Sequence, residues 1–136
     1  MSSENKQLSA RFTELFSTGD AEAAGEILSQ DLVFHGARRD GDIEGLDAFK
    51  GFLADYRRAF PDAHSTVEDQ VAEGDKVVTR WRARGTHDGP LGPLPATHRP
   101  FDTHGITIER IADGRIAEVW VVRDEAGLLA QLVPQT

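Results

Sequence analysis

Three titratable residues that are far apart in the sequence each stand beside apolar residues with the alternation of a β-strand. His35 ends the run DLVFH, His104 alternates with Ile106, and Asp124 directly follows the run IAEVWVVR. Because successive side chains of a strand point to opposite faces, alternation places each of them on the side of its apolar neighbours. We therefore predict that all three face the interior, where burial and neighbouring charges tune imidazole and carboxyl groups for proton transfer.

Each of these residues also has a purely structural interpretation. An isolated histidine next to apolar residues is more often a hydrogen-bonded core residue than a catalyst, which applies to His35 and His104 taken singly. Asp124 precedes the segment EAGL, so it stands where the N-cap of a last helix belongs. Capping and proton transfer do not exclude each other, and the sequence leaves both open.

Aromatic residues and further histidines are the candidate substrate contacts. An apolar pocket needs large flat walls and a few polar groups that orient the ligand. Ordinary core packing is the alternative for the aromatic residues, and exposure on a loop is the alternative for His98. The predicted substrate-binding residues are Trp81, Trp120, Phe101, Tyr56, Phe60, His87 and His98.

The residues that commonly bind metals do not occur at metal-binding spacings. The sequence contains no HExxH, no HxH and no cysteine. We therefore predict no metal site and no cofactor.

Hydrophobic spacing predicts helices first and then a series of antiparallel strands. Two strand pairs are joined by the turn signals Gly74-Asp75 and Asp113-Gly114. This order favours an α+β fold in which helices cover one face of a strongly curved sheet and enclose a pocket. The first expected helix is capped by Ser2 or Ser3 and ends at Gly19. The other expected helices cover 21–28, 46–60 and 125–132, the strands 31–35, 66–72, 77–87, 101–111 and 116–123, and the loops 36–45 and 88–99.

Length and composition indicate a single domain, residues 1–136, with no affinity for polyanions. The 23 acidic and 15 basic residues give a net charge of −8, which disfavours nucleic acid and anionic membrane surfaces as partners. The absence of cysteine excludes disulfides and thiol nucleophiles. No signal peptide or membrane span is visible, so we expect a cytoplasmic protein.

Four segments together cover about residues 60–132: FPDAHSTVEDQVAEGDKVVTRW, GTHDGPLGPLPATHRPF, HGITIERIADGRIAEVWVVRD and GLLAQL. They resemble the SnoaL-like polyketide cyclase family, also called ester cyclases, of the nuclear-transport-factor-like α+β cone superfamily. The resemblance implies a cone with a deep cavity and a homodimer or homotetramer formed through the sheet. One departure is His98, which stands where relatives usually carry glycine after PAT.

The resemblance also implies a reaction and the residues that perform it. In the polyketide cyclases an aspartate on the last strand is general base and acid in an intramolecular aldol closure without a metal. Asp124 looks like that aspartate, and His35 and His104 look like its companion histidines. The expected function is a cofactor-independent acid/base enzyme acting on a small, hydrophobic, carbonyl-bearing substrate. The alternatives are an epoxide hydrolase, isomerase or hydroxylation-associated enzyme on the same fold, or a ligand-binding module without turnover.

Overall fold

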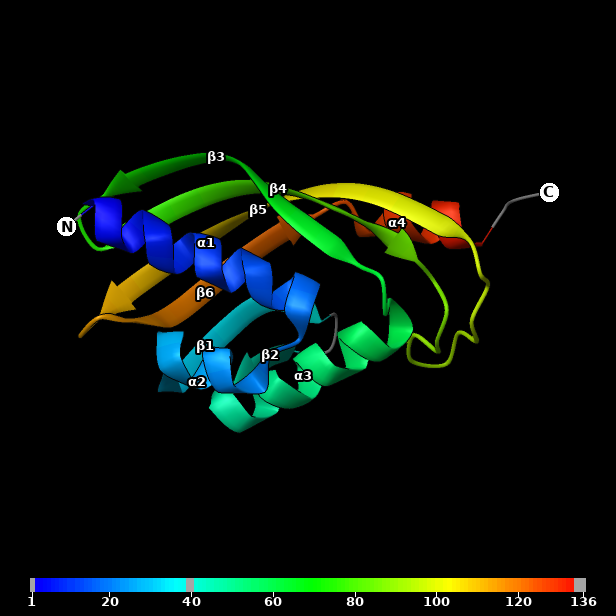
Figure 1. The fold of residues 1–136 in the computed structure, drawn as a ribbon, viewed down its shortest axis with the longest axis horizontal. Helices are drawn as coiled ribbons and strands as arrows, with labels where there is room; N and C mark the ends of the chain where they lie inside the picture. Colours follow the sequence, from blue (N-terminus) through cyan, green and yellow to red (C-terminus); the bar gives the residue numbers. More distant parts are fainter. Residues whose placement is uncertain (1, 39–40, 134–136) are drawn as a thin grey trace.

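The computed structural model describes residues 2–38 and 41–133. It has four helices and six strands in the described residues, ordered along the chain as in Figure 1. They are α1 (Ser2–Thr18), α2 (Ala21–Ile27), β1 (Leu28–Arg38), β2 (Gly41–Glu44), α3 (Leu46–Ala59), β3 (His64–Glu73), β4 (Lys76–Thr86), β5 (Pro100–Ala112), β6 (Arg115–Arg123) and α4 (Glu125–Leu132). No helix of these residues is long and apolar enough to span a membrane.

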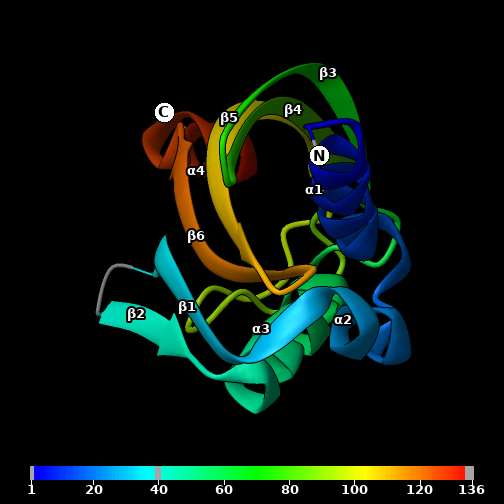
Figure 2. The same cartoon turned by 90° about the vertical axis from the view of Figure 1, so that its left-hand side faces the viewer.

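The six strands form one curled sheet, in the order β2-β1-β6-β5-β4-β3. All neighbours are antiparallel except β1 and β6, which run parallel with His35 opposite Trp120. Figure 2 shows the sheet bending into an open cone, with α1 along β3 and β4 and with α3 beneath β1. The predicted α+β cone with a mostly antiparallel sheet is therefore confirmed.

Aromatic side chains of the helices fill the concave side of the sheet. Phe12 and Phe49 are almost fully buried, and their ring centroids lie 5.7 Å apart. Phe34 of β1 lies 5.9 Å from both rings, so one strand and two helices share this cluster. Leu15, one turn from Phe12 on the same face of α1, is also buried in this core.

The segment 36–45, predicted as a loop, is mostly strand. β1 continues to Arg38, and β2 pairs with it so that Phe34 lies opposite Ile43. Gly36 has a positive φ of 86°, and a Cβ atom there would lie 2.5 Å from the carbonyl oxygen of Val121. This glycine marks a close approach of two strands and not the start of a loop.

The prediction that His104 faces the interior is wrong. Along β5 the buried side chains are Phe101, Thr103, Gly105, Thr107, Glu109 and Ile111, and the alternate positions Asp102, His104 and Ile106 are exposed. Ile106 is 45% exposed, so an apolar residue on this strand does not identify the inner face. The interior positions from Thr103 to Glu109 are small or polar, so alternation of apolar residues does not mark them.

Candidate functional site

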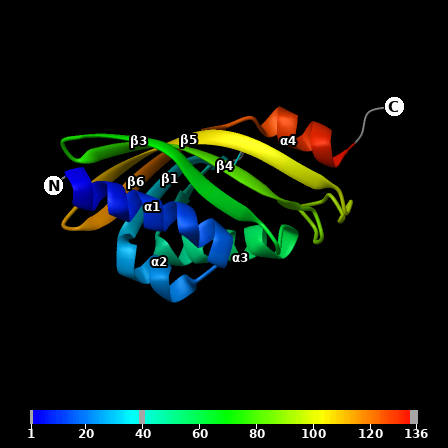
Figure 3. The same cartoon turned by 45° about the horizontal axis from the view of Figure 1, so that its top comes forward.

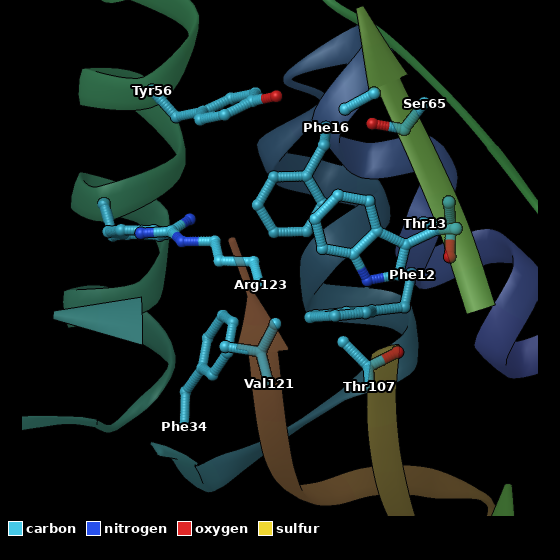
Figure 4. A pocket seen from close by; sticks show the side chains of 12 residues that line it. Phe12, Thr13, Phe16, Phe34, Tyr56, Ser65, Thr107, Val121 and Arg123 are labelled. Carbon is cyan, nitrogen blue, oxygen red and sulfur yellow. The ribbon is translucent and has the colours of Figure 1, made fainter. Parts of the chain in front are cut away.

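An internal cavity lies between α1, α3 and the concave side of the sheet. Its empty volume of about 490 Å³ includes space that is open to solvent. Figure 4 shows Phe12, Phe16 and Thr13 from α1, Tyr56 from α3, and Val121 and Arg123 from β6 around this space. The lining is completed by Phe34, Phe52, Ser65, Trp81, Ala83 and Thr107. We call this space the inner cavity.

The aromatic walls of the inner cavity support one another through edge contacts. The ring of Phe16 lies 5.4 Å from Phe12 and 5.4 Å from Tyr56, in both cases nearly perpendicular. Such pairs add to the stabilisation from area burial, so the walls are held in place before a ligand binds. A Cβ atom at Gly105 would overlap the indole of Trp81, so the absence of a side chain there lets Trp81 lie across β5.

Tyr56 and Arg123 are the ionisable groups among the described residues that line the inner cavity. Burial raises the pKa of the Tyr56 phenol, and the charge of Arg123 and the Ser65 hydroxyl partly oppose that rise. Tyr56 is therefore a hydrogen-bond donor at neutral pH. Arg123 donates from Nη2 to the backbone oxygen of Ala37 at 2.9 Å. Its guanidinium group is positively charged and has further N–H donors.

A wider hollow of about 1,490 Å³, which includes open solvent, continues from the inner cavity. The two spaces share Phe52, Tyr56 and Arg123, so these side chains stand at the junction. The hollow is bordered by the loop between β4 and β5, at residues 90–93, and by α4. Figure 3 shows this loop and α4 at the same end of the molecule. We call this hollow the mouth.

His35 lies on the outer, convex face of the sheet and lines neither the inner cavity nor the mouth. Its Nδ1 lies 2.8 Å from Asp42 Oδ2, its Nε2 lies 2.7 Å from Glu118 Oε2, and its ring stacks on Trp120 at 5.3 Å. The hydrogen bond to Glu118 is the main cause that raises the pKa of His35. The side chain thus joins β1, β2 and β6.

His104 and Asp124 also lie outside the inner cavity and the mouth. His104 Nε2 is 3.8 Å from Glu68 Oε1, and its side chain is 58% exposed. Asp124 is exposed and caps α4, accepting a hydrogen bond from the backbone N–H of Gly127 at 2.8 Å. β6 ends at Arg123, so strand alternation does not extend to Asp124. The predicted convergence of His35, His104 and Asp124 in one pocket is therefore wrong, and a catalytic role for each of them stays a prediction.

Three of the aromatic residues predicted to bind substrate do line the two spaces. Tyr56 and Trp81 border the inner cavity, and Phe60 borders the mouth. Phe101 instead packs in the core, with its ring 4.7 Å from Phe60. Trp120 is on the convex face, because its two neighbours along β6, Val119 and Val121, point inward.

The two loop histidines predicted to touch substrate hold the loop between β4 and β5. His87 is fully buried, and its Nδ1 accepts a hydrogen bond from the backbone N–H of Thr97 at 3.2 Å. His98 is largely exposed, with Nδ1 3.0 Å from Asp88 Oδ1. His98 also adopts a positive φ of 59°, a conformation that favours glycine. In residues 2–38 and 41–133 no three acidic or histidine side chains gather as a metal site would require.

The polar residues that line the inner cavity carry no recognisable motif in the sequence. Arg123 is the last residue of a predicted strand, and Thr107 alternates with His104 and Ile106, the positions predicted to face inward. The signal that could have found both is the register of β5 and β6, where Thr107 lies opposite Val121 and Gly105 lies opposite Arg123. Small residues on one side of a long strand pair indicate space for a ligand.

The fold and the cavity define a cone-shaped α+β protein with an internal cavity. The family model of the SnoaL-like polyketide cyclases matches residues 6–132, which confirms the resemblance predicted from sequence. The chain belongs to this family.

Three relatives illustrate its range. Aklanonic acid methyl ester cyclase DnrD from Streptomyces peucetius is 28% identical over 90% of this chain and 86% of its own. The structure of IdmH from Streptomyces antibioticus is similar with a TM-score of 0.80 and 34% identity, over 94% of this chain and 97% of IdmH. AclR from Streptomyces galilaeus, for which a hydroxylase function has been suggested, has a TM-score of 0.84 and 25% identity, over 100% of this chain and 86% of AclR.

Proposed function

We propose that this chain is an enzyme that folds and cyclises a small, hydrophobic, carbonyl-bearing molecule by a polyketide-type intramolecular aldol reaction. The observation that carries the proposal is the inner cavity, whose aromatic walls meet one cation and one phenol at the junction with the mouth. The name of the relative DnrD, an aklanonic acid methyl ester cyclase, supports the same substrate class.

The chemistry of ring closure suits this arrangement. Removal of a proton from an ester-activated methylene gives an enolate, whose charge is shared by two carbonyl oxygens. In the proposed reaction Arg123 and the Tyr56 hydroxyl, which both line the inner cavity, donate hydrogen bonds to that charge, and an apolar site strengthens such bonds. The aromatic walls hold the chain folded, so that the carbanion and the accepting carbonyl carbon stay close.

Ligand binding without turnover is the second candidate. It is favoured by one observation: among the described residues lining the inner cavity there is no carboxylate and no histidine. A direct proton acceptor is therefore not in contact with that space. A binding module and an enzyme make different predictions for the same variants.

The test uses aklanonic acid methyl ester as the probe, with Arg123→Met, Tyr56→Phe and the matched control Arg80→Met, an exposed arginine on β4. We expect Arg123→Met to lower kcat/KM about 100-fold and Tyr56→Phe at least about tenfold, as for the loss of an oxyanion donor. Arg80→Met should leave kcat/KM unchanged. Tight binding of the ester without consumption by the wild-type protein would instead favour the binding module, and neither binding nor consumption would refute both candidates.

The convex face of the sheet supports a homodimer or homotetramer, which we propose as the assembly. Val122 is 75% exposed and Ile106 is 45% exposed there, beside the stacked pair of Trp120 and His35. Burying such residues against a second copy would remove apolar surface from water. Light scattering after gel filtration would show a smaller species for Val122→Asp than for the wild-type protein, and an unchanged mass would contradict this placement of the interface.

A further inference from the structure

A buried carboxyl group lies on the concave side of β5, outside the residues that line the inner cavity. Glu109 is 0% exposed. Ser9 of α1 donates its hydroxyl hydrogen bond to Oε1, whereas Oε2 has no hydrogen-bond partner in the described part of the chain. Burial raises the pKa of Glu109 to about 7, and the hydroxyls of Ser9 and Thr107 oppose part of that rise.

The groups that face Glu109 are neutral. In the strand register Val77 of β4 and Val119 of β6 lie on either side of it, and Ser9 approaches from α1. Ser9 Oγ also lies 2.6 Å from Thr79 Oγ1. None of these carries a charge, so no cation among them stabilises the carboxylate. The group can therefore gain and lose a proton near neutral pH without breaking an ion pair.

Thr107 connects this carboxyl group to the inner cavity. It lies two residues before Glu109 on the same face of β5, and its side chain lines the inner cavity beside Val121 (Figure 4). Its hydroxyl oxygen is buried and, like Glu109 Oε2, makes no hydrogen bond to a described residue, yet it is near enough to Glu109 to lower the pKa of that carboxyl group. Thr107 thus adjoins both the inner cavity and the carboxyl group, and a relay requires its free hydroxyl to turn toward Oε2.

We propose that Glu109 is the proton acceptor for the reaction in the inner cavity and acts through the hydroxyl of Thr107. The proposal rests on the proposed function. A proton passes from the activated methylene carbon to Thr107 Oγ1 while the hydroxyl proton of Thr107 passes to Glu109 Oε2. The resulting carbanion forms a bond to the accepting carbonyl carbon, and the new alkoxide takes the proton back by the same route. The step is a net isomerisation, so no oxidant or co-reactant is required.

A purely structural role does not account for a carboxyl group at this position. Glutamine has the same shape, would accept the hydrogen bond from Ser9, and would avoid burying a charge without a counter-ion. A group that destabilises the fold in its charged form and adjoins a cavity is a candidate for function. In this pair Thr107 would be the residue that touches the substrate, and Glu109 would receive the proton through it.

The first test compares the pH dependence of turnover of aklanonic acid methyl ester in matched variants. The wild-type kcat should rise with pH through an inflection near about 7, since the deprotonated carboxyl is required. Glu109→Gln and Thr107→Val should each lower kcat about 100-fold or more, remove the inflection and leave KM within about threefold. Thr107→Ser keeps a hydroxyl group at this position, so it should retain the wild-type kcat and the inflection. Ser9→Ala should move the inflection upward, because the carboxylate loses a hydrogen bond.

The second test does not require ring closure and so separates this proposal from the proposed function. Methyl benzoylacetate has an acidic methylene that exchanges its protons for deuterium in heavy water, which nuclear magnetic resonance records. We expect the wild-type protein and Arg80→Met to accelerate the exchange and Glu109→Gln and Thr107→Val not to. Exchange at the buffer rate with the wild-type protein, or equal acceleration by Glu109→Gln, would overturn the role of Glu109 even if the ester is cyclised.

Discussion

The two faces of the same strands differ in what their polar groups do. On the convex face charges are paired: His35 with Glu118, and Arg82 with Asp102. These partners lower the pKa of Glu118 and of Asp102 and so favour the charged forms. On the concave face Glu109 is shifted the other way, toward the neutral form. The convex face has more charged groups but is less suited to proton transfer, because those groups already form ion pairs with one another.

The largest effect should come from removing the buried acid. A carboxyl group whose pKa is raised in the folded protein stabilises it below the ordinary pKa of 4.5, and that contribution is lost as pH rises through about 7. We expect this loss to reach about 3 kcal/mol of unfolding free energy near pH 8, and Glu109→Gln to abolish it. Urea unfolding at several pH values from about 4 to about 8 measures the difference.

The matched control is Glu118→Gln on the convex face, where the sign reverses. The pKa of Glu118 is lowered, chiefly by the hydrogen bond from His35, so it stabilises the fold above its ordinary pKa and ceases to do so as pH falls. Glu118→Gln should therefore lower the free energy of unfolding at neutral pH and leave it unchanged at acid pH. The same pH dependence in both variants would show that the two faces do not differ as described.

The next largest effect separates two adjacent residues of β6. Val121 lines the inner cavity, and Val122 is 75% exposed on the convex face. Val121→Phe should fill the space beside Thr107 and reduce kcat/KM for aklanonic acid methyl ester about 100-fold, because the substrate no longer reaches its reactive geometry. Val122→Phe should have no effect on kcat/KM. Circular dichroism shows whether both variants keep the fold, and equal activities would place the ligand elsewhere.

A smaller effect is expected at the end of β6. Asp124 accepts a hydrogen bond from Gly127 as the N-cap of α4, so Asp124→Ala should cost about 1 kcal/mol of unfolding free energy. Asp124→Asn keeps a capping oxygen and should retain both stability and turnover. If Asp124→Asn loses turnover while α4 stays folded, the aspartate is the catalytic group after all.

The smallest effect should come from His104. Its imidazole is 58% exposed and lies 3.8 Å from Glu68, a separation that gives little stabilisation at a surface. His104→Gln should change the unfolding free energy by less than about 0.5 kcal/mol and turnover by less than about twofold. A larger loss of turnover, with stability unchanged, would mean that the convex face takes part in the reaction.

The sequence predicts where most helices and strands lie, but it does not predict which side chains of a strand point into the interior. The spacing of Phe49 and Leu53, with Pro61 beyond, located α3, and the Asp113-Gly114 turn located the hairpin of β5 and β6. Alternation cannot assign a face when both faces carry apolar residues. Ile106 outside misled the assignment of β5, and Gly105 inside gave no hydrophobic signal.

Two features of the site depend on contacts between distant segments. Thr107 and Glu109 become significant only once α1 covers β5 and places Ser9 on the carboxyl group. The pairing of β1 with β6 brings Arg123 to Ala37, far from it in sequence. Local spacing contains neither of these contacts, so single-sequence reasoning could not find the site.

The parallel pairing of β1 with β6 also constrains how the protein can fold. Phe34 lies opposite Val119. The edge of β1 that faces β6 therefore stays uncovered until one of the last segments of the chain has been synthesised. Contacts of such long sequence separation slow folding and leave apolar surface exposed in the meantime. A nascent chain released before β6 has been made would present the Phe12 and Phe49 side chains to chaperones and to aggregation.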